Sequence, residues 1–181
     1  MLGNFCGDFV KGTLDHWPNA FAQGVRLHRQ IDRFTDDHPL VMELKQQCPP
    51  VVRRFSGIAL DIYFDHLLLT HWPVFTEQTA AAVLADFYQQ LACFSLPISP
   101  RFQLTRANLL EHQWLIDMHE AQSCLKSLQS IENRLSRQIR FAQAAFAWLM
   151  AEQHSINQAF LHFYPLLIRY IKNQCQQQER L

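Results

Sequence analysis

The sequence has no glycine after position 57, although it runs to 181 residues. Glycine weakens helices and marks turns, so its absence from the rest of the chain favours long helices there. No segment shows the sustained alternation of apolar and polar residues that is typical of a strand. We therefore predict an all-α, HD-like helical bundle, and because no linker is evident, a single domain over residues 1–181.

The sequence also lacks an excess of charge of either sign, since 16 Lys and Arg balance 16 Asp and Glu. A neutral chain gives no support for nucleic-acid binding through a general basic surface. The start has no cationic and apolar leader, and no apolar run approaches the roughly 18 residues of a membrane span. We expect neither a nucleic acid nor a membrane as partner.

Paired cysteines are missing too. The five cysteines are odd in number, widely spread and never in a CxxC pair, which argues against both a disulfide framework and a thiolate zinc site. A reducing compartment follows, and we expect the cytoplasm. There is no P-loop, no GxGxxG and no nucleophile elbow that would assign a Ser or Cys nucleophile.

Apolar spacing, prolines and capping residues predict the helices. They are expected over residues 17–34, 51–71, 80–94 and 100–120, from Ser130 to Met150, and from about Ser155 onward with a kink at Pro165. Thr76 or Thr79, Ser99 and Ser130 are the predicted N-caps.

The acidic residues are unevenly distributed. Glu residues lie almost entirely in the later part of the chain, as expected for solvated helix surface, whereas most Asp residues lie early. Asp is a poor residue for a helix interior, so these positions need another explanation. They are Asp8, Asp15, Asp32, Asp36, Asp37, Asp61 and Asp65.

Two groups of these residues have the spacing of metal ligands. His28, Asp32 and Asp36 are four residues apart, which places them on one face if the segment is helical. Asp61 and Asp65 share a face in a second, otherwise apolar helix, with His66 next to them. Carboxylates inside an apolar helix cost several kcal/mol unless they are paired or bind a cation.

Two counter-charges are available. In one interpretation the Asp residues pair with Arg29, Arg33, Arg53 and Arg54, which for any single Asp is the more common arrangement. In the other a divalent ion is held by His28 and Asp32 together with Asp61, Asp65 or His66. Mixed nitrogen and oxygen ligands suit Mn²⁺, Mg²⁺ or Fe²⁺ better than a structural zinc.

Asp8 lies between glycines in the segment LGNFCGDFVKG, residues 2–12. It could cap a helix, pair with Lys11, or act as a ligand or base. Lys11, Arg26 and Arg29 lie in the same part of the sequence and could hold a phosphate group, although such residues are more often solvated surface.

These segments, in this order, resemble the bacterial acyl carrier protein phosphodiesterases. The similarity rests on residues 2–12, on HRQIDRFTD with Pro39, and on LDIYFDHL with Trp72. It continues through SPRF at residues 99–102, QWL at 113–115 and FYP at 163–165, so that it covers nearly the whole chain. Family members carry a short His-containing segment before the Gly-Asn element that this sequence does not contain, and any ligand it supplies is expected to be missing here.

The resemblance implies an HD-type metal-dependent phosphohydrolase. Such an enzyme would use Mn²⁺, or Mg²⁺ or Fe²⁺, to cut the phosphodiester between 4'-phosphopantetheine and a Ser of holo-acyl carrier protein. It implies His28, Asp32, Asp61, Asp65 and His66 as metal ligands. Asp8 and Asp36 would orient the water or a ligating imidazole, Arg29 and Lys11 would hold the phosphate, and the acidic carrier protein would dock near Lys11, Arg26 and Arg29.

Two other functions stay open. The same residues could serve an HD-like phosphohydrolase that acts on a nucleotide or another small phosphodiester. Alternatively, the chain could be a helical module that binds carrier protein without catalysis.

Overall fold

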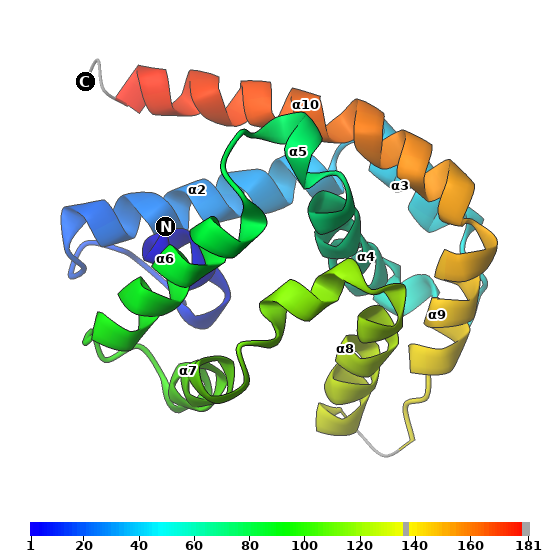
Figure 1. The fold of residues 1–181 in the computed structure, drawn as a ribbon, viewed down its shortest axis with the longest axis horizontal. Helices are drawn as coiled ribbons and strands as arrows, with labels where there is room; N and C mark the ends of the chain where they lie inside the picture. Colours follow the sequence, from blue (N-terminus) through cyan, green and yellow to red (C-terminus); the bar gives the residue numbers. More distant parts are fainter. Residues whose placement is uncertain (136–137, 179–181) are drawn as a thin grey trace. The chain divides into compact units, whose positions relative to one another are not determined.

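The protein is all-helical throughout the part that the structure describes. In this computed structural model, residues 1–135 and 138–178 are described, and every regular element among them is an α-helix or a 3₁₀-helix. This confirms the all-α prediction (Figure 1). None of the described helices combines the length and the apolar character needed to cross a bilayer.

The chain forms two compact units, each made from two separate stretches. The first unit combines Met1–Phe34 with Glu77–Ile116, and the second combines Thr35–Thr76 with the chain from Asp117 onward. Neither boundary carries a linker, so the division into two units could not be predicted from the sequence. The assignment of one domain to residues 1–181 stays a prediction.

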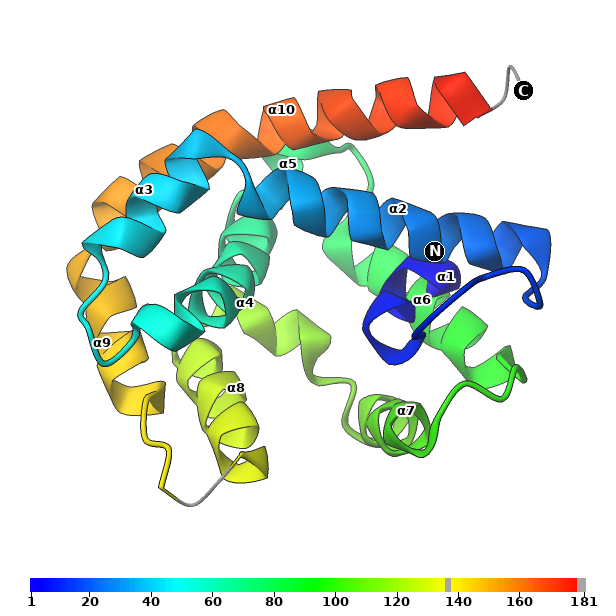
Figure 2. The same ribbon diagram turned by 180° about the vertical axis from the view of Figure 1, so that it is seen from behind.

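The first unit is built around α1, η1, α2, α6 and α7. Their bounds are Leu2–Phe5 (α1), Gly7–Phe9 (η1), Asn19–Asp36 (α2, whose last two residues belong to the second unit), Ala80–Cys93 (α6) and Pro100–His112 (α7). α1 packs against η1 and α6, and α6 packs against α7 (Figure 2). Val25, Leu91 and Phe102 are among the residues fully buried in its core.

Two early glycines allow α1 to lie directly against α2. A Cβ atom on Gly24 would lie 2.7 Å from the Cα atom of Gly3, and one on Gly3 would lie 2.5 Å from the carbonyl oxygen of Phe21. Side chains do not fit at such distances, so both positions require glycine. The early glycines are therefore explained in part by this close approach of two helix backbones.

The second unit contains the remaining helices. Their bounds are Pro39–Gln47 (α3), Arg53–Phe55 (η2), Ser56–Thr70 (α4), Trp72–Phe75 (α5), Ala121–Arg134 (α8), Ala142–Ala151 (α9) and Gln153–Gln178 (α10), with η3 (Trp114–His119) running from the first unit into the second. α4, α8 and α9 pack against one another, and α10 packs against α3, α4 and α9 (Figures 1 and 2). Phe141, Phe160 and Phe163 are buried in this unit.

Several predicted boundaries agree with the structure. Thr79 caps α6 by accepting a hydrogen bond from the Ala82 N–H at 3.2 Å, and Ser99 caps α7 by accepting one from the Phe102 N–H at 3.2 Å. The choice between Thr76 and Thr79 is thereby settled. α10 contains Pro165 and continues through it, while the kink expected there stays a prediction.

Three predicted boundaries are wrong. α4 begins at Ser56 rather than residue 51, because the short helix η2 precedes it. The helix expected over residues 100–120 ends at His112, where Gln113 adopts a left-handed conformation with φ of 47°. Ser130 lies inside α8 instead of capping a helix, and α9 begins only at Ala142.

Candidate metal centre

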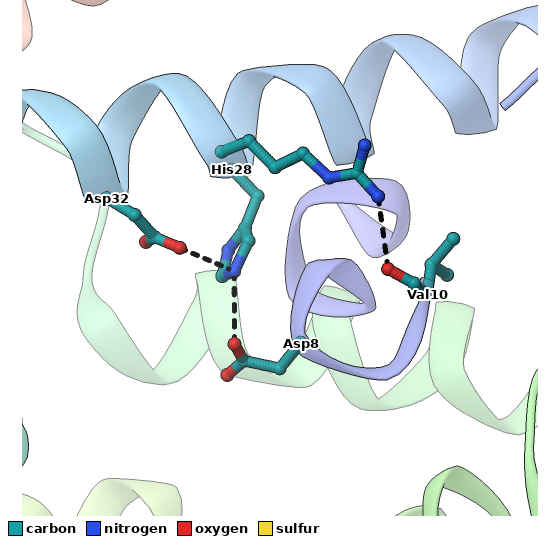
Figure 3. A network of polar contacts seen from close by, with 5 residues as sticks. Asp8, Val10, His28 and Asp32 are labelled. Atoms are coloured by element: carbon teal, nitrogen blue, oxygen red, sulfur yellow. Dashed lines mark hydrogen bonds and ion pairs between the residues drawn. The ribbon is translucent and has the colours of Figure 1, made fainter. Parts of the chain in front are cut away.

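Two carboxylates face one imidazole in the first unit. The Nε2 atom of His28 lies 3.1 Å from an oxygen of Asp32 and 3.4 Å from an oxygen of Asp8. Figure 3 shows the ring of His28 pointing between the two carboxylates. One donor atom from each residue lies within 4.8 Å of the other two, and no other such group of three occurs in the described part of the chain.

The local sequence explains how these side chains meet. His28 and Asp32 are one turn apart in α2, so they lie on the same face, as their spacing predicts. Asp8 comes from the 3₁₀-helix η1, which approaches α2 at Gly7. A Cβ atom on Gly7 would lie 2.0 Å from Cδ2 of His28, so glycine is required for Asp8 to reach the imidazole.

Arg29 fixes the loop that follows η1. Its Nη2 atom donates hydrogen bonds to the carbonyl oxygens of Val10 and Gly12, both at 3.2 Å. The first of these is the dashed line to Val10 in Figure 3. The resemblance implies that Arg29 holds the phosphate. The structure shows its Nη2 atom donating to the backbone that follows Asp8, and the phosphate contact stays a prediction.

The cluster has strongly shifted proton affinities. Hydrogen bonds to Asp32 and Asp8, together with the negative charges of both residues, raise the pKa of His28 to about 9. The hydrogen bond and charge of His28, with a smaller effect from the charge of Arg101, lower the pKa of Asp8. In the absence of another cation, the proton on His28 neutralises part of the negative charge at this site.

The residues fit a divalent cation. The cluster offers one imidazole nitrogen and two carboxylate groups without a thiolate, a donor set that suits Mn²⁺, Mg²⁺ or Fe²⁺. The imidazole is mostly covered, with 18% of its side-chain surface exposed, while Asp8 and Asp32 are open to solvent at 72% and 53%. A cation and the proton of His28 compete for the same atoms.

Arg101, which was not among the predicted site residues, brings a positive charge close to Asp8. The guanidinium carbon of Arg101, at the start of α7, lies 5.4 Å from the centre of the Phe9 ring. Phe9 directly follows Asp8 in η1. The sequence contained two signals here, the cap at Ser99 and the SPRF segment of the family resemblance, but neither predicts what Arg101 lies against.

Asp36 has a partner of its own. Its carboxylate accepts a hydrogen bond from the Lys45 ammonium at 2.6 Å, which ties the end of α2 to α3 in the second unit. Neither Arg29 nor Arg33, the pairing partners considered from sequence, makes this contact. A role for Asp36 in orienting water stays a prediction.

The predicted ligands of α4 belong to the second unit. Asp61 and Asp65 both have exposed surface on α4, but the surrounding protein desolvates the Asp65 carboxylate, and this together with the charge of Asp61 raises the pKa of Asp65 to about 7. This agrees with the predicted cost of placing carboxylates on an apolar helix. The residues that α4 buries include Leu60, Tyr63 and Leu67. His66 has its Nδ1 atom 2.9 Å from the Met118 carbonyl oxygen.

Comparisons with known proteins agree with the resemblance. The family model described as "Acyl carrier protein phosphodiesterase" matches residues 1–167. A protein of that name from Yersinia pestis is 34% identical over 176 residues, covering 93% of this chain and 88% of the relative. Another, from Enterobacter sp. (strain 638), is 30% identical over 178 residues, covering 96% and 90%. No solved structure matches the chain.

Proposed function

Because this chain belongs to the acyl carrier protein phosphodiesterase family, we propose that it hydrolyses the phosphodiester bond between 4'-phosphopantetheine and a Ser of holo-acyl carrier protein. The products are apo-acyl carrier protein and free 4'-phosphopantetheine, and the reaction takes place in the cytoplasm. The observation that carries the proposal is the Asp8, His28 and Asp32 cluster, since its donors suit a divalent ion, and such an ion would activate water for hydrolysis of a phosphodiester near neutral pH.

Asp8, His28 and Asp32 hold the metal ion in this proposal, and Mn²⁺ is the expected ion. When bound, such an ion supplies a Lewis acid that activates water and offsets negative charge on the phosphoryl oxygens. The support is the donor set itself, because two carboxylates and an imidazole converge from two different helices. Asp61, Asp65 and His66 stay predicted ligands, and Lys11 a predicted contact of the phosphate.

The residues of the chain also prepare the site. Gly7 leaves room for the imidazole beside η1, and Arg29 holds the backbone that follows Asp8 through two carbonyl groups. His28 would have to be neutral to ligate a cation, so binding of the ion would release the proton that the imidazole otherwise holds.

The protein substrate is acidic, so it requires basic residues on the surface that it meets. Lys11, Arg26 and Arg29 are exposed in the first unit and are proposed to face the carrier protein. Long-range attraction of this kind raises the association rate and weakens with salt.

The proposal is tested by incubating the protein with holo-acyl carrier protein and Mn²⁺ and following the mass of the carrier protein. We expect loss of the phosphopantetheine mass with the wild type and with Asp15→Asn, and little or none with Asp32→Asn. Asp15 is an exposed Asp of the same unit outside the cluster, so it controls for the change from Asp to Asn.

Two results would contradict the proposal in different ways. Cleavage of small phosphodiesters with no change in the mass of holo-acyl carrier protein would indicate a small-molecule phosphohydrolase. Binding of the carrier protein without cleavage of either substrate would indicate a non-catalytic module.

A further inference from the structure

A bound divalent ion does not by itself make this site attractive to a phosphodiester. Two ionised carboxylates and a neutral imidazole balance the charge of such an ion, so the loaded cluster would be close to neutral. A phosphodiester carries one negative charge, and more develops on its oxygens during hydrolysis. A further cation beside the cluster is therefore required to hold the substrate.

The arginine side chains of the first unit differ in the contacts that they make. Arg29 donates to the carbonyl oxygens of Val10 and Gly12, and Arg106 donates to those of Leu91 and Ala92. These guanidinium groups already satisfy backbone acceptors. They hold loops and helix ends in place.

Arg101 is used differently. It is exposed, and no ion pair in the described ranges of the chain involves it. Its guanidinium lies over the ring of Phe9, the residue after Asp8, and its charge acts on the Asp8 carboxylate. This contact with the ring pairs none of the guanidinium N–H groups with an oxygen acceptor, so they stay available to an anion.

We infer that Arg101 contacts the phosphoryl oxygens of the substrate beside the Asp8, His28 and Asp32 cluster. This inference rests on the proposed function for the identity of the substrate, while the phosphate contact itself follows from the placement of Arg101. Arg29 is then a positioning residue that orders the segment carrying Asp8.

Two features of the fold set the place of Arg101. The Ser99 cap fixes the first turn of α7, in which Arg101 is the second residue. The next residue, Phe102, is fully buried and lies 5.5 Å from the Phe9 ring, centre to centre. The helix start is thus anchored to η1 on one side, while Arg101 stays at the surface. A guanidinium can form two parallel hydrogen bonds to a phosphate, which an ammonium cannot.

The test compares Arg101→Gln and Arg101→Lys with Arg33→Gln. Arg33 is an exposed arginine of the same unit, one residue past Asp32 and so about 100° round the helix from it. Binding of inorganic phosphate to the Mn²⁺-loaded protein is measured by calorimetry. We expect Arg101→Gln to weaken phosphate binding about 10- to 100-fold, Arg101→Lys to weaken it less, and Arg33→Gln to change it less than about twofold.

Two controls separate a phosphate contact from a structural role. The melting temperature and the Mn²⁺ affinity should match the wild type in all three variants, because the only contact recorded for the Arg101 side chain in the described residues is with the Phe9 ring, and its backbone carbonyl keeps the hydrogen bond from Thr105 in any variant. In assays with holo-acyl carrier protein and with a small phosphodiester, Arg101→Gln should lower turnover of both substrates. A loss confined to the carrier protein would overturn the inference and make Arg101 a docking residue.

The two assays distinguish a wrong inference about Arg101 from a wrong assignment of the substrate. If Arg101→Gln binds phosphate as the wild type does, or if the wild type binds none, the inference is wrong whatever the carrier-protein assay gives. If phosphate binding depends on Arg101 while the wild type leaves holo-acyl carrier protein intact, the inference stands and the proposed substrate is wrong.

Discussion

At the scale of single residues, Gly7 decides whether the candidate metal centre can form. The space that a Cβ atom would occupy is taken by the ring of His28, with Cδ2 at 2.0 Å and Cγ at 2.2 Å. A side chain at this position must push the imidazole away from Asp8 and Asp32. At least one of the glycines in the early part of the chain, Gly7, therefore serves to position a candidate metal ligand.

We expect Gly7→Ala to weaken Mn²⁺ binding about 10- to 100-fold, the range seen when groups that orient a metal ligand are changed. Calorimetric titration with Mn²⁺ measures the effect. Gly57→Ala is the control, because a Cβ atom there meets nothing closer than Lys45 Cε at 3.7 Å. This substitution should leave Mn²⁺ affinity unchanged and stabilise α4 by up to about 1 kcal/mol. Unchanged Mn²⁺ affinity in Gly7→Ala would show that the ring of His28 is not needed in its present place.

His28 also makes the stability of the metal-free protein depend on pH. Its pKa is about 9 in the folded protein, against an ordinary value of 6.5, so the folded state binds the proton more tightly than the unfolded state. The resulting stabilisation is complete below pH 6.5 and is lost as the pH rises through about 9. Because both carboxylates reach solvent, we expect it to be about 1 kcal/mol.

Urea unfolding of the metal-free protein at pH values below 6.5 and above 9 measures this effect. The free energy of unfolding should fall with rising pH in the wild type and change less in His28→Gln. Mn²⁺ affinity should change in the opposite direction and increase as the pH rises, because the ion displaces the proton. Equal slopes in the wild type and His28→Gln would mean that His28 does not hold an extra proton.

At the scale of elements, a distant side chain caps α9. The carboxylate of Glu132, in α8, accepts hydrogen bonds from the Phe141 N–H at 2.6 Å and the Ala142 N–H at 2.9 Å. These bonds lower the pKa of Glu132. The stabilisation is therefore present above the ordinary pKa of Glu and is lost as the pH falls through the lower folded value.

We expect Glu132→Gln to lower the free energy of unfolding at neutral pH by about 1 kcal/mol, as the loss of a helix cap does. Glu77→Gln, an exposed residue, should change it by less than about 0.5 kcal/mol. Denaturant unfolding at pH 7 compares the two. A Glu132→Gln variant as stable as Glu77→Gln would show that the α9 terminus does not depend on this carboxylate.

A comparison of this cap with those of α6 and α7 explains which helix boundaries could be predicted from the sequence. Thr79 and Ser99 lie next to the helices that they cap, and the local sequence was sufficient to find both. The cap of α9 comes from a residue ten positions away in another helix, so Ser130 was chosen wrongly. Helix type followed from composition and spacing, whereas boundaries set by tertiary contacts could not be derived from them.

The residues of the site also divide into those that the local sequence predicts and those that it does not. His28 and Asp32 were found because one helix face displays both, and Asp8 was a candidate because it is a lone acid between glycines. Nothing local placed Arg101 beside Phe9 or gave Asp36 its partner Lys45. The first contact joins segments distant in sequence and the second joins two successive helices, and in both cases the pairing depends on how the helices pack, which the local sequence pattern does not predict.

At the scale of the whole molecule, a bound metal ion is expected to stabilise one of the two compact units more than the other. The cluster of three donors lies within the first unit, in η1 and α2. A ligand that binds only the folded state stabilises it by about 2.7 kcal/mol at 100 times its dissociation constant. The unit that contains the ligands is the part that is prevented from opening.

We therefore expect Mn²⁺ to slow amide hydrogen exchange most in η1 and α2, and EDTA to reverse the effect. Asp32→Asn should abolish this protection, because it removes one of three converging donors. Asp65→Asn changes a carboxylate of α4 outside this group of three donors and should reduce Mn²⁺ affinity less than about tenfold, because Asp8, His28 and Asp32 already converge. Loss of protection in Asp65→Asn equal to that in Asp32→Asn would contradict this expectation and make the α4 carboxylate an essential ligand.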